Sequence, residues 1–174
     1  MIAYGIGVFP LIWDLLGAHP RATQPCYADD AGAGGMFKDV QAHFQDLQAR
    51  GLARGYCPEP TKSILVVAPG KVALAEEHFR GLCIRMVTGH QYLGDFLGDI
   101  AVEREWLEKK VQGWKESVQI LAGVALKHPQ SAYEGLQNPL QQKWAFVQRG
   151  TSRVGAAFGP VEEALREVFF LALF

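Results

Sequence analysis

Two adjacent carboxylates, Asp29 and Asp30, follow Tyr27 and Ala28 in a segment predicted to be a short strand, a tight turn and a second short strand. Neighbouring carboxylates repel each other, and this repulsion is costly where both are partly buried. Mg²⁺ cancels the repulsion and prefers oxygen ligands. Adjacent strand residues point to opposite faces, so a tight turn is one of the few places where both carboxylates can reach one ion. A solvated type I turn, in which Asp is common, is the alternative interpretation.

Three lesser signals also contain residue types that do chemistry. The glycine-rich stretch Gly32–Gly35 runs into a predicted helix and could bind phosphate, although it lacks the spacing of a full phosphate-binding loop. The segment Glu76–His78 could supply ligands, but consecutive helix positions fan apart, which favours a solvated helix face. Cys26, Cys57 and Cys83 are odd in number and have no CxxC spacing, so reduced thiols are expected rather than disulfides or a zinc site.

The balance of charges limits the classes of partner. The chain has 174 residues, of which 49% are hydrophobic, and its 17 Lys and Arg against 18 Asp and Glu give a formal net charge of −1. This composition fits one soluble domain or part of one, and it excludes a uniformly basic nucleic-acid coat. Contact with nucleic acid would need a local cluster of basic residues such as Lys109–Lys110, a pair that is otherwise typical of a solvated helix face.

Neither end of the chain resembles a targeting signal. The apolar segment 1–16 lacks a basic start and contains Pro10 and Asp14, so a signal peptide is not expected. No apolar run reaches the length of about 20 residues that a bilayer requires. We therefore expect an intracellular protein, in the nucleus or the cytoplasm, that is not secreted and has no membrane partner.

Hydrophobic periodicity predicts alternating helices and strands in the first part of the chain. Apolar residues recur at spacings of three and four in three segments, which predicts helices over 1–17, 36–50 and 71–82. Gly51 is expected to end the second of these helices. The β-branched run 63–67 predicts a buried strand. The segments 83–87 and 92–97 are expected to form a pair of strands around a turn at Gly89–His90.

The last third of the chain is predicted to be entirely helical. A long helix is expected from an N-cap at Asp99 to a stop at His128–Pro129. A second helical stretch is expected to break at Pro139. A loop over 150–159 then leads to a final helix with Pro160 in its first turn. Together with the first part, this pattern predicts an α+β fold.

Tyr27–Asp30, between two short strands, resembles the catalytic hairpin in the palm of reverse transcriptases, which are RNA-directed DNA polymerases. Further segments follow in the order found in that family. The helix at 36–50 and the segment Pro60–Ser63 before a buried strand resemble the next palm motif. Gln91–Gly98 resembles the Tyr-Leu-Gly segment of retroelement (retrotransposon) polymerases, where a hairpin grips the primer. The helices from residue 99 onward would then match the thumb.

This resemblance implies a fold and a chemistry, two-metal nucleotidyl transfer onto a primer. A partial palm with an antiparallel sheet and packed helices would span 1–98, and a thumb-like helical region would span 99–174. Asp29 and Asp30 would be catalytic carboxylates that hold Mg²⁺, and Lys62 would stabilise the leaving pyrophosphate. The residues that would lie beside the nucleotide and the primer are Tyr27, Ala28, Tyr92 and Gly94. The implied partners are an RNA or DNA primer–template and a deoxynucleoside triphosphate.

The resemblance has two gaps. The family takes another metal-binding aspartate from an earlier palm strand, whereas Asp14, the only acid before the hairpin, lies in a predicted helix. The nucleotide-binding fingers have no counterpart in the sequence. We therefore expect the palm and thumb portion of a reverse transcriptase that is inactive by itself and needs the missing N-terminal fingers and palm. Two alternatives stay open: a non-catalytic interaction domain that docks through the apolar C-terminal segment 168–174, and a phosphate-binding enzyme that uses Gly32–Gly35.

Overall fold

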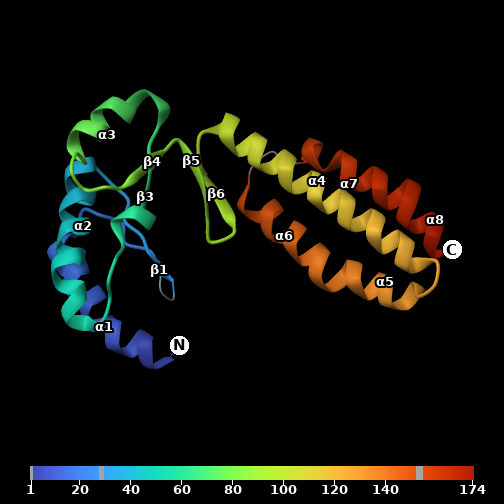
Figure 1. The fold of residues 1–174 in the computed structure, drawn as a ribbon, viewed down its shortest axis with the longest axis horizontal. Helices are drawn as coiled ribbons and strands as arrows, with labels where there is room; N and C mark the ends of the chain where they lie inside the picture. The colour runs from blue at the N-terminus through green and yellow to red at the C-terminus, as the bar shows by residue number, and fades with distance from the viewer. Residues whose placement is uncertain (1, 28–29, 152–154) are drawn as a thin grey trace. The chain divides into compact units, whose positions relative to one another are not determined.

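The computed structural model describes residues 2–27, 30–151 and 155–174. It has the expected α+β fold, with helices over most of its length and short strands in pairs. The chain divides between Val87 and Thr88 into two compact units (Figure 1). Within the described ranges, no helix is both long enough and apolar enough to cross a membrane.

The first unit contains the three predicted helices. They are α1 (Ile2–Ala18), α2 (Phe37–Gly51) and α3 (Val72–His78), the last of which ends four residues before its predicted end at residue 82. α1 and α2 pack against each other through Val8, Leu11, Leu15 and Leu47, all of which are buried. Burial of one such side chain contributes roughly 1.5–3 kcal/mol. Helix α1 is as predicted, but its contact face is not, because Phe9 and Trp13, two residues whose spacing predicted the helix, are 59% and 67% exposed.

α2 ends at Gly51, within one residue of the prediction, but Gly51 is helical, with a φ of −60°, and does not have the left-handed conformation of a C-cap glycine. The chain continues through a 3₁₀ turn, η1 (Leu52–Arg54), and leaves the helix at Gly55, whose φ of 74° is left-handed. Gly51 is buried instead, because the backbone carbonyl of Tyr56 leaves no room for a side chain there. Both glycines are thus required near this helix end, one for close packing and the other for its backbone conformation.

The strands of the first unit form two separate pairs. β1 (Cys26–Tyr27) and β2 (Asp30–Ala31) are antiparallel, whereas β3 (Ile64–Val66) is parallel to β4 (Arg85–Val87). A parallel pair needs a crossover, and α3 lies in the connection between β3 and β4. The described strands of both units therefore make three two-stranded sheets rather than one antiparallel sheet, and the predicted pairing of 83–87 with 92–97 is wrong.

A second hairpin begins the other unit. β5 (Gly89–Tyr92) pairs antiparallel with β6 (Asp95–Gly98), so the turn predicted at Gly89–His90 is wrong. The chain turns at Leu93 and Gly94, whose φ values of 49° and 89° are both left-handed, as in a type I′ turn. This hairpin belongs to the helical unit, and the expected boundary after residue 98 therefore falls after Val87.

The rest of the second unit is helical, as predicted. Its helices are α4 (Ile100–Ala125), α5 (Pro129–Gly135), α6 (Gln141–Gly150), α7 (Gly159–Ala164) and α8 (Phe170–Leu173), and α4 lies between α5 and α7 (Figure 1). The carboxylate of Asp99 accepts a hydrogen bond of 2.9 Å from the N–H of Ala101, which confirms the predicted N-cap. Pro160 lies in the first turn of α7, as predicted.

Pro139 does not break the second helical stretch. The segment η4 (Leu136–Leu140), which contains it, is a π turn that joins α5 to α6. Proline lacks the N–H that a regular helix needs, and a wider turn accommodates this loss. A second π turn, η6 (Leu165–Phe169), joins α7 to α8.

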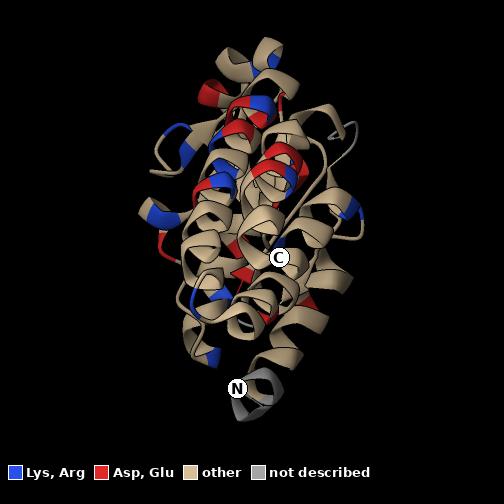
Figure 2. Ribbon diagram, turned by 90° about the vertical axis from the view of Figure 1, so that its right-hand side faces the viewer, with Lys and Arg blue, Asp and Glu red and all other residues tan. Residues whose placement is uncertain are grey.

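One apolar core holds the second unit together. It contains the predicted stripe of α4, and its members include Leu107, Val111, Trp114, Val118, Trp144, Val161 and Phe169. Acidic and basic residues are interspersed over the ribbons visible in Figure 2, in agreement with the balanced composition. A charged site must therefore come from a local arrangement of side chains.

Candidate functional site

The β1–β2 hairpin carries the described half of the predicted catalytic segment. Tyr27 pairs directly with Asp30 across the two strands, and both side chains are exposed. A bridge between Thr23 and Gly34 extends the antiparallel pairing away from these residues. Two short antiparallel strands are therefore present as predicted, and Asp30 lies in the second of them. Ala28 and Asp29 lie outside the described residues.

The glycine-rich stretch after the hairpin takes part in the same pairing. The N–H of Gly32 donates to the carbonyl of Pro25, and that of Gly34 donates to the carbonyl of Thr23, each over 2.8 Å. A phosphate-binding loop needs free N–H groups that point at the anion. These two N–H groups are already used, which weakens the case for a phosphate site at Gly32–Gly35.

Lys62 lies where the sequence predicts it, immediately before the β3 region, in the 3₁₀ turn η2 (Pro60–Lys62). Its ammonium lies 2.7 Å from Oε2 of Glu59, and both side chains are exposed. Hydrogen bonding and attraction within this pair raise the pKa of Lys62 and lower that of Glu59. Lys62 is therefore charged and accessible, with Glu59 as its ion-pair partner.

Metal ligands are sparse in the described part of the chain. Over residues 2–27, 30–151 and 155–174, no group of three or more His, Cys, Asp and Glu side chains could hold a metal ion. Asp30 is the one carboxylate of the predicted pair that lies within these ranges. The described donors do not by themselves make a two-metal site, and Mg²⁺ binding stays a prediction.

Two of the four residues predicted to lie beside the nucleotide and the primer, Tyr92 and Gly94, belong to the second unit. Tyr92 pairs with Asp95 at the end of the β5–β6 hairpin, and Gly94 lies in its turn. A Cβ at Gly94 would lie 3.0 Å from Cε1 of Phe146 on α6, so the turn backbone rests against this aromatic ring. Gly94 is thus needed for its left-handed φ and for this close approach.

A hollow of about 390 Å³ adjoins this turn, and we refer to it as the hairpin hollow. It is lined by residues of the hairpin (Gln91 and Gly94), of α4 (Lys110 and Trp114) and of α6 (Gln142, Lys143, Phe146 and Val147). Two of these residues are basic and none is acidic. Basic, amide and aromatic side chains together are the lining that suits an anionic ligand with flat apolar groups.

The hairpin is attached to the helices on both sides of the hollow. On the α4 side, the indole N–H of Trp106 donates to Oε1 of Gln91 over 3.3 Å. On the α6 side, the hydroxyl of the buried Thr151 donates to Oδ1 of Asp95 over 3.1 Å, and the Asp95 carboxylate leaves no room for a side chain at Gly150. These contacts hold the hairpin against α4 and against the end of α6. Asp95 and Thr151 are far apart in the chain, and no local pattern predicts their contact.

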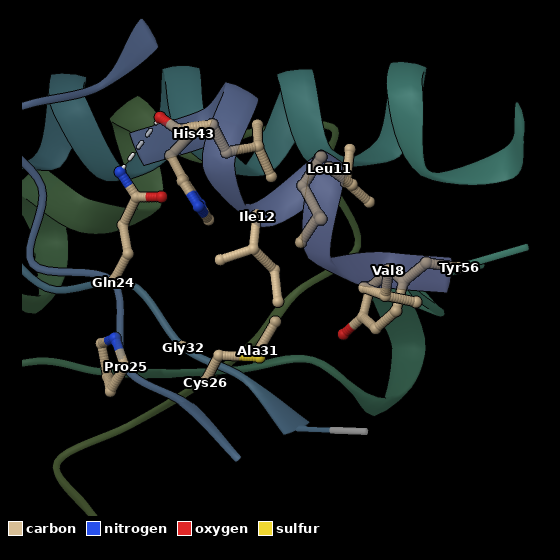
Figure 3. A pocket seen from close by; sticks show the side chains of 12 residues that line it. Val8, Leu11, Ile12, Gln24, Pro25, Cys26, Ala31, Gly32, His43 and Tyr56 are labelled. Carbon is tan, nitrogen blue, oxygen red and sulfur yellow. Dashed lines mark hydrogen bonds between the residues drawn. The ribbon is translucent and has the colours of Figure 1, made fainter. Parts of the chain in front are cut away.

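A buried histidine in the first unit was not predicted. His43 on α2 is only 4% exposed, and its Nδ1 has no hydrogen-bond partner. It lines a cavity of about 20 Å³ among apolar side chains of α1, such as Leu11 and Ile12 (Figure 3). His19 lies edge-on to it, with ring centroids 5.7 Å apart. His43 thus occupies a position in the α1–α2 contact that would suit an apolar residue.

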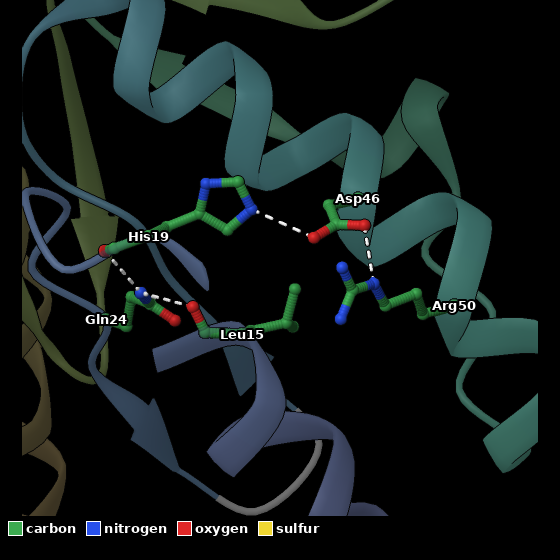
Figure 4. Close-up of polar contacts among 5 residues, drawn as sticks. All are labelled: Leu15, His19, Gln24, Asp46 and Arg50. Carbon is green, nitrogen blue, oxygen red and sulfur yellow. Dashed lines mark hydrogen bonds and ion pairs between the residues drawn. The ribbon is translucent and has the colours of Figure 1, made fainter. Parts of the chain in front are cut away.

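Polar contacts surround the neighbouring histidine. Nε2 of His19 lies 3.0 Å from Asp46, which also accepts a 2.7 Å hydrogen bond from Arg50 (Figure 4). The side-chain amide of Gln24 donates to the carbonyls of Leu15 and His19, which holds the chain after α1 (Figure 4). His19 and Asp46 therefore face the region around His43 from the end of α1 and from α2.

We expect the first unit to lose stability as the pH falls below about 6.5, the ordinary histidine value. Burial and the neighbouring His19 lower the pKa of His43, and their effect outweighs the opposing attraction of Asp46. Between the lowered and the ordinary pKa, the unfolded chain binds a proton that the folded chain does not. The free energy of unfolding is therefore highest above the ordinary value and falls as the pH drops through it. Urea unfolding of the whole chain, followed by circular dichroism at a series of pH values, measures this change.

Two substitutions assign the pH dependence to one side chain. His43→Leu is expected to flatten it, whereas His78→Gln, at an exposed histidine of the same unit, is expected to leave it unchanged. The titration of Asp46 affects stability only at lower pH. Desolvation raises its pKa, but hydrogen bonds from His19 and Arg50 outweigh this effect and lower the pKa below the ordinary 3.8. An undiminished pH dependence in His43→Leu would contradict this assignment.

The apolar C-terminal segment is partly buried. Phe169 is fully buried in the core of the second unit, whereas Leu171 is 73% exposed and Phe174 is completely exposed. The segment 168–174 therefore has one buried side and an exposed remainder. Docking of a partner through this segment stays an alternative prediction.

Comparison with known proteins assigns no function to the chain. No family model, no curated protein and no solved structure matches it. Its function must therefore be argued from its own residues.

Proposed function

We propose that the chain is the hairpin-bearing palm portion and the thumb of a retroelement reverse transcriptase, and that its second unit binds a nucleic-acid strand. In the intact enzyme the activity is two-metal nucleotidyl transfer onto a primer. The observation that carries the proposal is the hairpin hollow, whose lining includes two lysines and no acidic residue. The paired Tyr27 and Asp30 of the β1–β2 hairpin support it from the first unit.

The hairpin hollow can attract a phosphate backbone although the chain as a whole is slightly acidic. Phosphate binding depends on local cations, because each neutralised phosphate releases counterions. Lys110 and Lys143 come from different helices and line the same hollow, so their charges act on one ligand. The side chain of Gln142 adds a neutral hydrogen-bonding group for phosphate or sugar oxygens.

In the intact enzyme, Asp29 and Asp30 would be the carboxylates that hold Mg²⁺. The metal would neutralise charge on the reacting phosphates. Lys62 would exchange Glu59 for the leaving pyrophosphate. An exposed ion pair is only weakly stabilising, so this exchange costs little. Tyr27 would lie beside the incoming nucleotide and the primer end.

Replacement of both hollow lysines tests the nucleic-acid contact. The double variant Lys110→Gln/Lys143→Gln is expected to weaken binding of a labelled RNA–DNA primer–template that has a single-stranded template extension by at least about tenfold at low salt. It should also reduce the slope of log affinity against log salt by about 1.4 to 1.8, because two phosphate contacts are lost. Fluorescence anisotropy of the labelled strand over a range of salt concentrations measures both quantities.

A matched control separates the site from overall charge. Lys109→Gln/Lys127→Gln removes the same charge from exposed lysines of the same unit that do not line the hairpin hollow. This variant is expected to bind within about twofold of the original chain. Equal losses in the two double variants would show that binding is non-specific, and the proposal would then lack its main support.

A further inference from the structure

Phe146 is an exposed aromatic ring at the wall of the hairpin hollow. Its side chain is 47% exposed, although the neighbouring Val147 is buried in the core. Among the described residues it takes part in none of the ring–ring contacts of this unit, which join Phe96 to Trp106, Trp114 to Trp144 and Phe158, and Phe169 to Phe170. One edge of the ring rests against the turn at Gly94. The ring is thus held in position while much of its surface stays accessible.

The lysines place a phosphate backbone next to this ring. Lys143 is three residues before Phe146 on α6, so the two side chains lie on neighbouring positions of one helix face. Lys110 approaches from α4, and its ammonium lies 5.7 Å from the ring centroid of Trp106. Both lysines and Phe146 line the hairpin hollow, so a strand whose phosphates contact the lysines can place a base against Phe146.

We infer that Phe146 stacks on an unpaired base, so that the hairpin hollow selects single-stranded nucleic acid over duplex. The inference rests on the proposed function, because it requires the lysines to hold the backbone. A base in a duplex is already stacked and paired, and it cannot cover the ring without leaving the helix. The hollow of about 390 Å³ has room for one nucleotide.

Stacking makes the selection tolerant of sequence. Every base has an aromatic face, and removal of one stacking ring typically weakens binding by about 5- to 150-fold. Oε1 of Gln91, a polar atom close to the hollow, already accepts a hydrogen bond from Trp106. RNA and DNA single strands of the same base composition are therefore expected to bind with affinities within a few-fold of each other.

Oligothymidylate and an abasic strand of equal length test the inference on the whole chain. Both strands carry the same phosphates, but only the first carries bases. The original chain is expected to bind oligothymidylate about tenfold more tightly than the abasic strand and than a duplex with the same number of phosphates. Oligouridylate, the RNA counterpart, gives the comparison between the two sugars.

Substitutions at Phe146 assign the preference to the ring. Phe146→Ala and Phe146→Leu are expected to bind oligothymidylate about tenfold more weakly than the original chain and to bind the abasic strand with unchanged affinity. Phe146→Trp is expected to keep the preference for oligothymidylate. Phe170→Ala removes a comparably exposed phenylalanine from α8 and is the matched control. Since Phe146→Leu keeps an apolar side chain of similar size, its result stands even if Phe146→Ala fails to fold.

The outcomes separate this inference from the proposed function. The stacking role is wrong if Phe146→Leu binds oligothymidylate as tightly as the original chain. It is also wrong if this variant loses as much affinity for the abasic strand as for oligothymidylate. The lysine contacts stand in both cases. If the abasic strand and oligothymidylate bind equally to the original chain, the inference is also overturned. Failure of the proposed function has a different signature, in which Lys110→Gln/Lys143→Gln leaves the binding of every strand unchanged.

Discussion

Asp30→Asn is expected to abolish Mg²⁺-dependent primer extension when the chain is joined to the fingers and first palm strands of a retroelement polymerase. The substitution keeps the size of the side chain but removes the charge that would hold the metal. Loss of one preorganised charged group at a phosphoryl-transfer site costs about a thousandfold or more in rate. Asp30 is exposed on a two-residue strand, so the fold should tolerate the change. Extension of a labelled primer, with its rate measured in single turnover, gives the result. The 174-residue chain alone is expected to give no extension.

The control for this experiment is another acid of the same unit. Glu76→Gln removes a carboxylate from the exposed face of α3 and is expected to leave the extension rate unchanged. Asp29→Asn is expected to match Asp30→Asn, since both carboxylates would serve the same ions. Extension by Asp30→Asn within tenfold of the original rate would refute the metal-binding role of this residue.

The second large effect concerns the stability of the helical unit. Phe169→Ala is expected to lower its free energy of unfolding by about 3–5 kcal/mol, because the substitution leaves a cavity where a fully buried ring had packed. The ring belongs to the π turn η6 and packs in the same core as Val118 of α4. Few single substitutions in this unit remove as much buried apolar surface.

The tryptophans allow this unit to be followed by itself. Three of the four, Trp106, Trp114 and Trp144, lie in the second unit, and Trp13 is an exposed side chain of the first. In a Trp13→Phe background, fluorescence during urea unfolding therefore reports on the helical unit. Phe174→Ala, at a completely exposed ring, should change the free energy of unfolding by less than about 0.5 kcal/mol. A loss below 1 kcal/mol in Phe169→Ala would contradict the packing argument.

Periodicity predicted the long helices well because their apolar faces are continuous. The stripe of α4 at Leu107, Val111, Trp114 and Val118 is buried throughout, and Asp99 caps the helix as predicted. Glycine was a less informative signal, because it occurs both in turns or helix ends and where close packing leaves no room for a side chain. Gly51 is the last residue of α2, within one residue of the prediction, but it is required there for close packing against Tyr56, and Gly55 has the left-handed conformation expected of a cap. The glycine at position 89 was predicted to form a turn, but it lies in a strand against the ring of Phe96.

The candidate site was only partly accessible from the sequence. Tyr27, Asp30 and Gly94 belong to short local motifs, and the structure places all three in hairpins. Lys110 and Lys143 come together only through the packing of α4 against the rest of the unit, and no local pattern encodes that approach. The sequence interpretation placed both Lys109 and Lys110 on a solvated helix face. Lys109 is exposed, but Lys110 lines the hairpin hollow.

The π turn at Pro139 has a consequence for how the two ends of one helical stretch are oriented. A π turn contains one residue more than an α turn, so the positions after it are rotated by about 100° relative to an uninterrupted helix. This rotation sets which residues of α6 point inward, with Trp144 and Val147 in the core and Lys143 outside. Deletion of a single residue between 136 and 140 would shift the phase of everything that follows. The π turn at Pro139 thus determines which side chains of α6 enter the core and which are available to a ligand.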